Sequence, residues 1–397
     1  MQFFLERRPK KVSLEHWAWL GIAVQPGSKT VDRILRVFPD PEEFFLSGDS
    51  GISKVGGINA TEALRIRATS LDVAKKAVDT AENYGAKVIT KESLYYPQNL
   101  LSIESAPPVL YVLGDENCLN AEPAIAVVGT RRLSEYGNKM AGIIAGGLGS
   151  AGALVVSGMA LGIDSAAHKA CLAVGGKTVA VQGCGICKTF PPENVELKEL
   201  IAANGAVISE FVPDAEPAGS YFPIRNRIVS GMSLGVCVVE AAARSGTSIT
   251  ANLAFEQGRK VFAVPADVNR TTSQGTFKLL RNGAIPVADA KDILSEFGDD
   301  LTAHLSFDRI QKRKIEKNPE AKNERPKKQP KPVKKAPPAG ISKNALAIYD
   351  VLDRNPKSSD EISDLTGLSS PMVSVGLTEL EIAGLISPVS GRRFVIA

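Results

Sequence analysis

The sequence lacks several features by which protein classes are recognised, and each absence narrows the choice. No run of about 18 consecutive apolar residues occurs, so no membrane-spanning helix is predicted. The N-terminal sequence MQFFLERRPKKVSLEHW has only a short apolar stretch before its charges, which is the wrong order for a secretory signal. We therefore expect a cytoplasmic protein.

The motifs of nucleotide-dependent enzymes are also missing. No GxxxxGK[ST] sequence occurs, so a P-loop ATPase is not expected. No GxGxxG opens the first predicted strand–helix turn, and the GCG at 183–185 is too short and follows the third strand. No paired acid and base with an obvious nucleophile is present. The sequence therefore predicts a protein that is not an enzyme and carries no cofactor.

Histidine and cysteine are scarce, with three and five residues. The odd cysteine count argues against a disulfide framework. Cys184 and Cys187 form a CxxC pair, which could be redox-active or half of a zinc site. The second pair is missing and only His168 and Cys171 are near, so the two cysteines are read as loop residues. Asp164 and His168 are four residues apart, which predicts a hydrogen-bonded pair on one helix face.

The chain of 397 residues is too long for one typical domain. Its composition and hydrophobic patterns divide it into four regions. Residues 1–85 show apolar residues at helical spacing, which predicts a helical module similar to SAM or helix-hairpin-helix domains. Its segment 47–57 is rich in turn residues. The stretch VGGINATEAL could approach a DNA phosphate, but its glycine spacing is unusual, and a packing module is the favoured alternative.

Residues 86–305 alternate predicted strands and helices. The strands are short, β-branched and almost continuously apolar, as in central parallel strands covered on both faces. They are 124–129, 153–158, 178–183, 206–210, 235–240 and 260–265. The fold class predicted is α/β, with a Rossmann-like doubly wound parallel sheet.

Residues 306–340 are a linker rich in lysine and proline, with too few large apolar residues for a core. It could be a plain spacer or a basic arm that adds DNA affinity. Residues 309–340 hold 12 Lys and Arg against 3 Glu, while the whole chain carries a net charge of +4. The remaining residues are therefore net negative, and any basic surface on the folded part must be local.

Residues 341–397 read as three helices followed by a hairpin turning at Ser390-Gly391, the order of a winged-helix domain. Its expected recognition helix, SSPMVSVGLTELEIAG, contains no Lys or Arg and carries two glutamates. A helix that reads a DNA groove should be basic or neutral. We therefore expect this domain to make protein contacts rather than to read duplex DNA.

Small, hydroxyl and arginine side chains follow the predicted strands, at the sheet edge where doubly wound proteins bind ligands. Gly129, Thr130 and Arg131 follow the first strand, and Ser157 and Gly158 end the second. Glycine lets the backbone approach a ligand, threonine donates a hydrogen bond, and arginine forks onto phosphate. Helices that begin there point amides at the same place, so the edge is predicted to bind anions.

Two later segments extend this edge. Arg225, Asn226 and Arg227 suit phosphate or base-edge contacts, with a structural ion-pair cluster as the alternative. Ser245, Gly246 and Thr247 open an apolar helix, as a phosphate-binding loop would, with a plain capped helix as the alternative.

Taken together, the motifs resemble the DNA-processing protein A (DprA/Smf) family. The resemblance spans Tyr96 to about Ala284 and includes VVGTRRLSEYG, VVSGMALGIDSAAHKACL, FPIRNRIVSG and VVEAAARSGTSITANLAFEQGRKVFAVPA. Three positions depart from the family pattern, namely Leu161, Phe190 and Ala266.

The resemblance implies a core that binds single-stranded DNA, forms a homodimer, protects incoming DNA and loads the RecA recombinase in natural transformation. Carried over residue by residue, it implies that DNA or phosphate is bound by Gly129, Thr130, Arg131, Ser157, Gly158, Lys188, Phe190, Arg225, Asn226, Arg227, Ser245, Gly246 and Thr247. No metal site is expected. The alternative is a nucleotide phosphoribohydrolase of the cytokinin-activating (LOG-like) type, in which Glu240 would assist hydrolysis.

Overall fold

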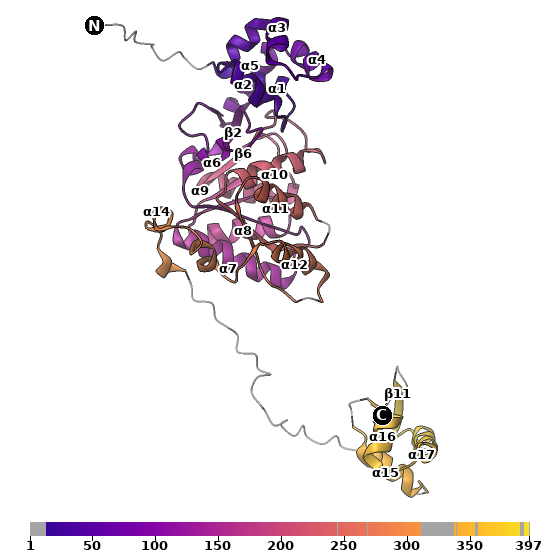
Figure 1. Cartoon of the computed structure of the whole chain (residues 1–397). Coiled ribbons are helices and arrows are strands. Elements are labelled where there is room, and N and C mark those ends of the chain that lie inside the picture. The colour runs from indigo at the N-terminus through magenta and orange to yellow at the C-terminus, as the bar shows by residue number, and fades with distance from the viewer. Residues whose placement is uncertain are drawn as a thin grey trace, which may run out of the picture. The chain divides into compact units, whose positions relative to one another are not determined.

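The computed structural model describes residues 13–243, 245–267, 269–310, 337–338, 340–353, 356–389 and 393–396. The chain divides into two compact units, Met1–Lys314 and Ile315–Ala397 (Figure 1). In the described ranges, no helix is both long and apolar enough to cross a membrane.

A helical module opens the first unit, as predicted for residues 1–85. Its helices are α1 (Leu14–Ala23), α2 (Thr30–Val37), α3 (Pro41–Val55), α4 (Ala60–Ala68) and α5 (Leu71–Asn83). Segment 47–57, expected to be turns, is mostly helical, because α3 continues through a kink at Gly48, where φ is 53°. A capping box between Asn59 and Glu62 begins α4.

A nine-stranded sheet forms the rest of the unit, in the order β1-β2-β6-β5-β4-β3-β7-β8-β9. From β6 to β9 all neighbouring strands are parallel, while β2 pairs antiparallel with both β1 and β6. The strands are β1 (Lys87–Thr90), β2 (Val109–Gly114), β3 (Ala124–Gly129), β4 (Leu154–Ser157), β5 (Thr178–Val181), β6 (Ala206–Ser209), β7 (Gly235–Glu240), β8 (Lys260–Ala263) and β9 (Ile285–Pro286).

Helices cover both faces of the sheet, which confirms the predicted fold class. One face packs on α6 (Gln98–Leu101), α10 (Tyr221–Gly231), α11 (Gly246–Glu256) and α12 (Gln274–Arg281). The other face packs on α7 (Glu135–Ala151), α8 (Ile163–Ala173), α9 (Val195–Asn204) and α13 (Ala290–Leu294). The chain runs outward from β3 to β6 and then returns to β7 beside β3, so the strand order reverses between β3 and β7.

All six strands expected from the sequence are present, but two features differ. Strands β1, β2 and β9 were not predicted; β1 and β2 extend the sheet on its antiparallel side, and β9 pairs with β8 at the other edge. The core also continues past the predicted boundary at 305: after α14 (Asp299–Thr302), a 3-10 helix (Phe307–Arg309) lies beyond that boundary, and Ile310 is buried against α7. Of the predicted linker, residues 311–336 and 339 lie outside the described residues.

The second unit has the predicted order of a winged-helix domain. It contains α15 (Lys343–Val351), β10 (Lys357–Ser358), α16 (Ser359–Thr366), α17 (Ser370–Ile382), β11 (Ile386–Val389) and β12 (Arg393–Ile396). Its own core includes Ile348, Ile362, Val373 and Leu380. The predicted turn at Ser390-Gly391 lies outside the described residues, but β11 and β12 pair antiparallel on either side of it.

Candidate functional site

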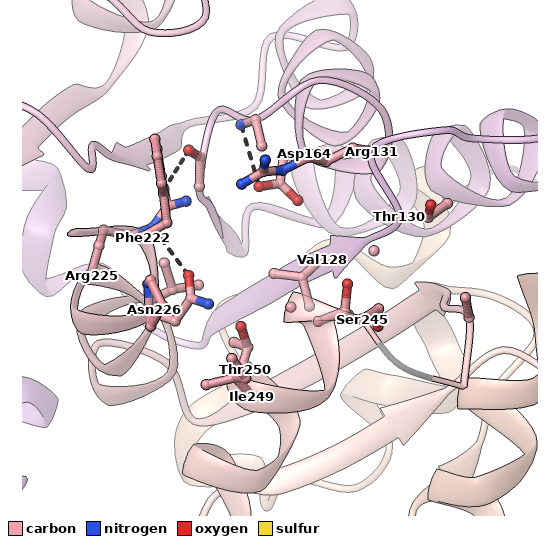
Figure 2. A pocket seen from close by; sticks show the side chains of 18 of the residues that line it. Val128, Thr130, Arg131, Asp164, Phe222, Arg225, Asn226, Ser245, Ile249 and Thr250 are labelled. Atoms are coloured by element: carbon pink, nitrogen blue, oxygen red, sulfur yellow. Dashed lines mark hydrogen bonds between the residues drawn. The ribbon is translucent and has the colours of Figure 1, made fainter. Parts of the chain in front are cut away.

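A cavity of about 610 Å³ opens at the carboxyl ends of β3 and β7, where the strand order reverses. This is the position at which doubly wound sheets bind ligands, and the volume is typical of a small-molecule site. Its wall comes from the loops after β3, β4 and β7 and from α10 and α11 (Figure 2).

Most of the predicted binding residues meet in this cavity. Those that line it are Gly129, Thr130, Arg131, Gly158, Arg225, Asn226, Ser245, Gly246 and Thr247. Four predicted residues do not line it: Ser157, Lys188, Phe190 and Arg227.

The two glycines make room for protein atoms at the cavity wall. A Cβ at Gly129 would lie 2.5 Å from Ile163 Cγ1, and a Cβ at Gly158 would lie 2.4 Å from Arg225 Nη1. Gly129 therefore has a packing reason as well, and the approach of a ligand to its backbone stays a prediction. At both positions the side chain of any other residue would clash with its neighbour, so only glycine allows this close packing.

Arg131 and Arg132 are exposed cations that line the cavity, and Arg131 also contacts an aromatic ring. The guanidinium carbon of Arg131 lies 5.3 Å from the centre of the Phe222 ring, within cation–π range. In Figure 2, Arg131 lies above the cavity, while Ser245 and Thr250 of α11 line it from below. Among the described residues, Arg131 has no carboxylate partner within salt-bridge distance, so its charge is available to a ligand.

Arg225 has a structural role in the cavity wall. Its side chain is 3% exposed, and Nη1 donates to the carbonyl oxygens of Gly158 and Val181, at the ends of β4 and β5. Burial lowers the pKa of Arg225, and the carboxylate of Asp164 opposes that shift. Burial likewise raises the pKa of Asp164, with Arg225 offsetting part of the rise. Arg225 therefore holds α10 against the strand ends and contributes its charge to the cavity at a distance.

Arg227 and Ser157 point elsewhere. Arg227 forms a buried ion pair with Glu210, the two side chains being 8% and 4% exposed. The alternative of a structural ion-pair cluster therefore holds for this arginine. Ser157 Oγ donates to the carbonyl oxygen of Val127 at 2.7 Å, across two neighbouring strands, and is fully buried.

Lys188 and Phe190 lie on a loop that is organised by another lysine. Lys198 on α9 is 3% exposed, and its Nζ donates to the carbonyl oxygens of Ile186 and Lys188. Lys188 itself pairs with Glu216 at 2.6 Å. The Phe190 ring is 37% exposed and lies 5.4 Å from the Phe222 ring, beside the cavity rather than within it.

We predict that Lys198→Met lowers the free energy of unfolding by about 1–3 kcal/mol, since two buried carbonyl oxygens lose a charged donor. Urea unfolding measures this effect. The matched control is Glu196→Gln, an exposed change on the same helix, which should leave stability unchanged. Equal stability of the two variants would show that the loop does not depend on Lys198.

Helices α7, α8, α10 and α11 begin near the cavity, and their N-termini differ. The carboxylate of Glu240 accepts from Ser134 N at the start of α7, at 3.0 Å. Asp164 lies in the first turn of α8 and accepts from Ala160 N at 3.4 Å. In contrast, α11 has no acidic residue in its first turn, and no side chain of the described residues caps it. The protein's own carboxylates therefore occupy the N-termini of α7 and α8, whereas α10 and α11 have neither an acidic residue in the first turn nor a side-chain cap among the described residues.

Thr250 is a cavity residue that the sequence analysis missed. Thr247 and Thr250 are three residues apart on α11, line the cavity, and are 8% and 3% exposed. Their hydroxyl groups have no hydrogen-bond partner within the part of the chain that the structure describes. The i, i+3 spacing after Gly246 could have identified Thr250, because it places both hydroxyl groups on one helix face.

The residues considered for catalysis or metal binding are not arranged for either. His168 bonds to Thr178 Oγ1 at 2.7 Å, so the predicted pair with Asp164 is wrong. Burial lowers the pKa of His168 to about 3. Glu240 does not line the cavity. All five cysteines are free thiols, and no group of three potential metal ligands occurs among the described residues.

Comparison with known proteins identifies two matching families. The model of the family described as DNA recombination-mediator protein A matches residues 87–298, and that of the DprA winged helix domain matches residues 330–392. Protein Smf of Synechocystis sp. is 35% identical over 321 residues, covering 77% of this chain and 79% of the relative. DNA processing protein DprA of Streptococcus pneumoniae is 42% identical over 202 residues, covering 51% of this chain and 71% of the relative.

Two solved structures agree with these matches. The X-ray structure of DprA from Streptococcus pneumoniae superposes with a TM-score of 0.65 and 32% identity, covering 73% of this chain and 99% of that one. A structure of DprA from Helicobacter pylori, described for its single-stranded DNA binding mode, gives a TM-score of 0.50 and 29% identity, covering 55% of this chain and 99% of that one. The chain therefore belongs to the DNA processing protein A (DprA/Smf) family.

Proposed function

We propose that the chain binds single-stranded DNA in the cavity at the ends of β3 and β7, without catalysing a reaction. Membership of the family gives it a role in DNA processing. The observation that carries the proposal is the uncapped N-terminus of α11, which opens into a cavity that also holds the exposed guanidinium of Arg131.

The phosphate would bind at this N-terminus. The first backbone N–H groups of a helix lack partners within the helix, and its dipole favours an anion there. The hydroxyl groups of Thr247 and Thr250 add two donors on the same helix face. A Cβ at Gly246 would meet no atom within 4 Å, so the approach to this end is open.

The neighbouring nucleotides would extend toward Arg131. Its guanidinium can bind a second phosphate, and its contact with Phe222 holds it at the edge of the cavity. Phe222 and Phe190 together offer aromatic surface beside the cavity, on which bases can stack without regard to sequence. Phosphate contacts at one end and stacking at the other are typical of proteins that bind single strands of any sequence.

The absence of catalysis is part of the proposal. Glu240, the residue that a phosphoribohydrolase of the LOG-like type would use, is 3% exposed and bonds to the start of α7. Asp164 is the carboxylate that does line the cavity, and Arg225 and backbone N–H groups hold it. These contacts support a structural role for both carboxylates.

Three finer features of the proposal rest on family membership. They are the pairing of two copies into a homodimer, the loading of RecA onto the bound strand, and the protection of incoming DNA during natural transformation. A cytoplasmic location remains a prediction as well.

The test is the affinity for a short oligo-dT, measured by fluorescence anisotropy over a range of salt concentrations. We expect the affinity to fall as salt rises, because phosphate contacts release counterions. A nucleoside monophosphate incubated with the protein should release no base. Failure to bind oligo-dT, or base release, would contradict the proposed function.

Thr250→Val tests the position of the phosphate within the cavity. We expect about a tenfold or greater loss of oligo-dT affinity, since one hydrogen bond to a charged group contributes about 1.5–3 kcal/mol. The thermal midpoint should stay unchanged, because the hydroxyl has no partner among the described residues of the free protein. Thr80→Val, on α5 and outside the cavity, is the matched control. If wild type binds and both threonine variants bind equally well, the phosphate does not contact Thr250.

A further inference from the structure

The cavity at the ends of β3 and β7 carries more positive charge than one internal phosphate of a strand requires. Among the described residues that line it, three arginines and one aspartate are charged, which gives a net charge of +2: Arg131, Arg132, Arg225 and Asp164. A phosphate inside a strand carries one negative charge, whereas a terminal phosphate carries about two near neutral pH. The charge of the cavity therefore matches a terminal phosphate.

Hydrogen-bond donors gather at the start of α11. Its first backbone N–H groups have no side-chain cap among the described residues. Thr247 and Thr250 line the cavity, are 8% and 3% exposed, and have hydroxyl groups without a partner in the described part of the chain. Because an unpartnered polar group inside a protein is costly, these hydroxyl groups indicate a polar ligand. A terminal phosphate offers them three acceptor oxygens, one more than an internal phosphate has free.

Much of the remaining lining is apolar and suits a base. The apolar side chains are Val128, Phe222, Pro223, Val229 and Ile249. Asn226 adds one polar group: its Oδ1 accepts from Arg225 Nε at 3.2 Å, so its Nδ2 remains to donate to a carbonyl oxygen of a base. Phe222 and Asn226 are neighbours on α10, and Ile249 and Thr250 are neighbours on α11 (Figure 2). The volume of about 610 Å³ lies in the range of small-molecule sites, large enough for phosphate and base together.

We propose that the cavity binds a nucleotide with a terminal phosphate more tightly than an internal nucleotide of a strand. The phosphate lies at the first turn of α11, and the base lies against the apolar lining beside Asn226. Two sources share this chemistry: the phosphorylated end of a DNA strand and a free nucleoside monophosphate. The inference rests on the proposed function for the position of the phosphate, and it adds the form of nucleotide that the site prefers.

Pairs of oligo-dT of one length test the strand end as the source. Fluorescence anisotropy compares a 5′-phosphate with a 5′-hydroxyl on oligonucleotides labelled at the 3′ end, and a 3′-phosphate with a 3′-hydroxyl on oligonucleotides labelled at the 5′ end. We expect the phosphate at one of the two ends to strengthen binding about tenfold or more, the effect of one added hydrogen bond to a charged group.

Calorimetry with thymidine 5′-monophosphate and with thymidine tests the free nucleotide as the source. Binding of the monophosphate, with thymidine at least about tenfold weaker, supports this source. If oligo-dT binds but no phosphorylated ligand is preferred over its hydroxyl counterpart, the inference is overturned and the proposed function stands. If no oligo-dT binds, the proposed function fails, and binding of the monophosphate alone then supports a mononucleotide site.

Two variants place the terminal phosphate inside the cavity. Arg132→Ala should lower the preference for the phosphorylated ligand about twofold to fivefold, because it removes one exposed charge of the lining. Thr250→Val should lower the preference as well, since the third oxygen loses a donor. Arg36→Ala, an exposed change on α2 outside the cavity, is the matched control. A preference that neither Arg132→Ala nor Thr250→Val changes would place the terminal phosphate elsewhere and overturn the proposal.

Discussion

Replacing Arg227 with alanine is expected to lower the free energy of unfolding by about 3–5 kcal/mol, because Glu210 is then left buried without its partner. A domain of this kind has only about 5–15 kcal/mol of stability in total, so the loss is large. Glu210→Ala should cost about as much, since Arg227 would then be the unpaired charge. Burial already raises the pKa of Glu210, which indicates that its carboxylate depends on Arg227 to remain charged.

Urea unfolding of four variants measures this effect. Replacing both residues with apolar ones, as in Arg227→Met with Glu210→Leu, should recover most of the stability that either single change removes. The control is the exposed pair of Lys188 and Glu216, where Lys188→Ala should cost less than about 1 kcal/mol. Losses below about 1 kcal/mol for both Arg227→Ala and Glu210→Ala would mean that the buried pair is not a structural element.

Replacing Arg131 with alanine is expected to weaken oligo-dT binding by about 10-fold to 100-fold. A charge-assisted contact contributes about 1.5–3 kcal/mol, and each 1.4 kcal/mol corresponds to a factor of ten. The slope of log affinity against log salt should also become shallower by about 0.7, the value for one phosphate of a single strand. Stability should not change, because Arg131 is exposed and, among the described residues, its side chain contacts the Phe222 ring without forming an ion pair.

Fluorescence anisotropy at several salt concentrations separates these two effects. Arg131→Lys should fall between wild type and Arg131→Ala, since it keeps the charge but loses the planar fork. Arg36→Ala, an exposed change on α2 outside the cavity, should leave both the affinity and the slope unchanged. If Arg131→Ala and Arg36→Ala bind alike, Arg131 is not a phosphate contact.

The sheet was largely predictable because its central strands are short apolar runs separated by helical segments. Strand β2 was not predicted, although its sequence VLYVLG has the same character as the others. A continuous apolar run does not show whether a strand pairs parallel or antiparallel with its neighbours. The sequence pattern therefore cannot indicate that β2 pairs antiparallel with β1 and β6. The end of the core was misplaced for a related reason, since Ile310 is an isolated apolar residue whose burial depends on α7.

The site was predictable at the level of loops but not of individual side chains. The sequence grouped Arg225 with Arg227, yet one lies in the cavity wall and the other pairs with Glu210 on the far side of α10. Residues two apart on a helix point in different directions, and the partner of Arg227 is the residue that follows β6, which no local pattern reveals. Thr250 was not predicted as a binding residue. It stands out because its buried hydroxyl group has no hydrogen-bond partner among the described residues, which the sequence alone does not show.

The helical module was drawn from the sequence as a separate region, yet it shares a core with the sheet. Trp17 of α1 and Ala81 of α5 are buried in one cluster with Tyr111 of β2 and Ile201 of α9. Tyr84, at the end of α5, lies under the ammonium group of Lys198, 5.2 Å from the ring centre. Removing residues 1–85 would therefore expose part of the sheet's core. It would also remove Tyr84, the aromatic neighbour of Lys198, which holds the loop beside the cavity. Composition suggests a domain boundary at residue 85. Because the helical module and the sheet share one core, the chain cannot be divided there into two independently folded parts.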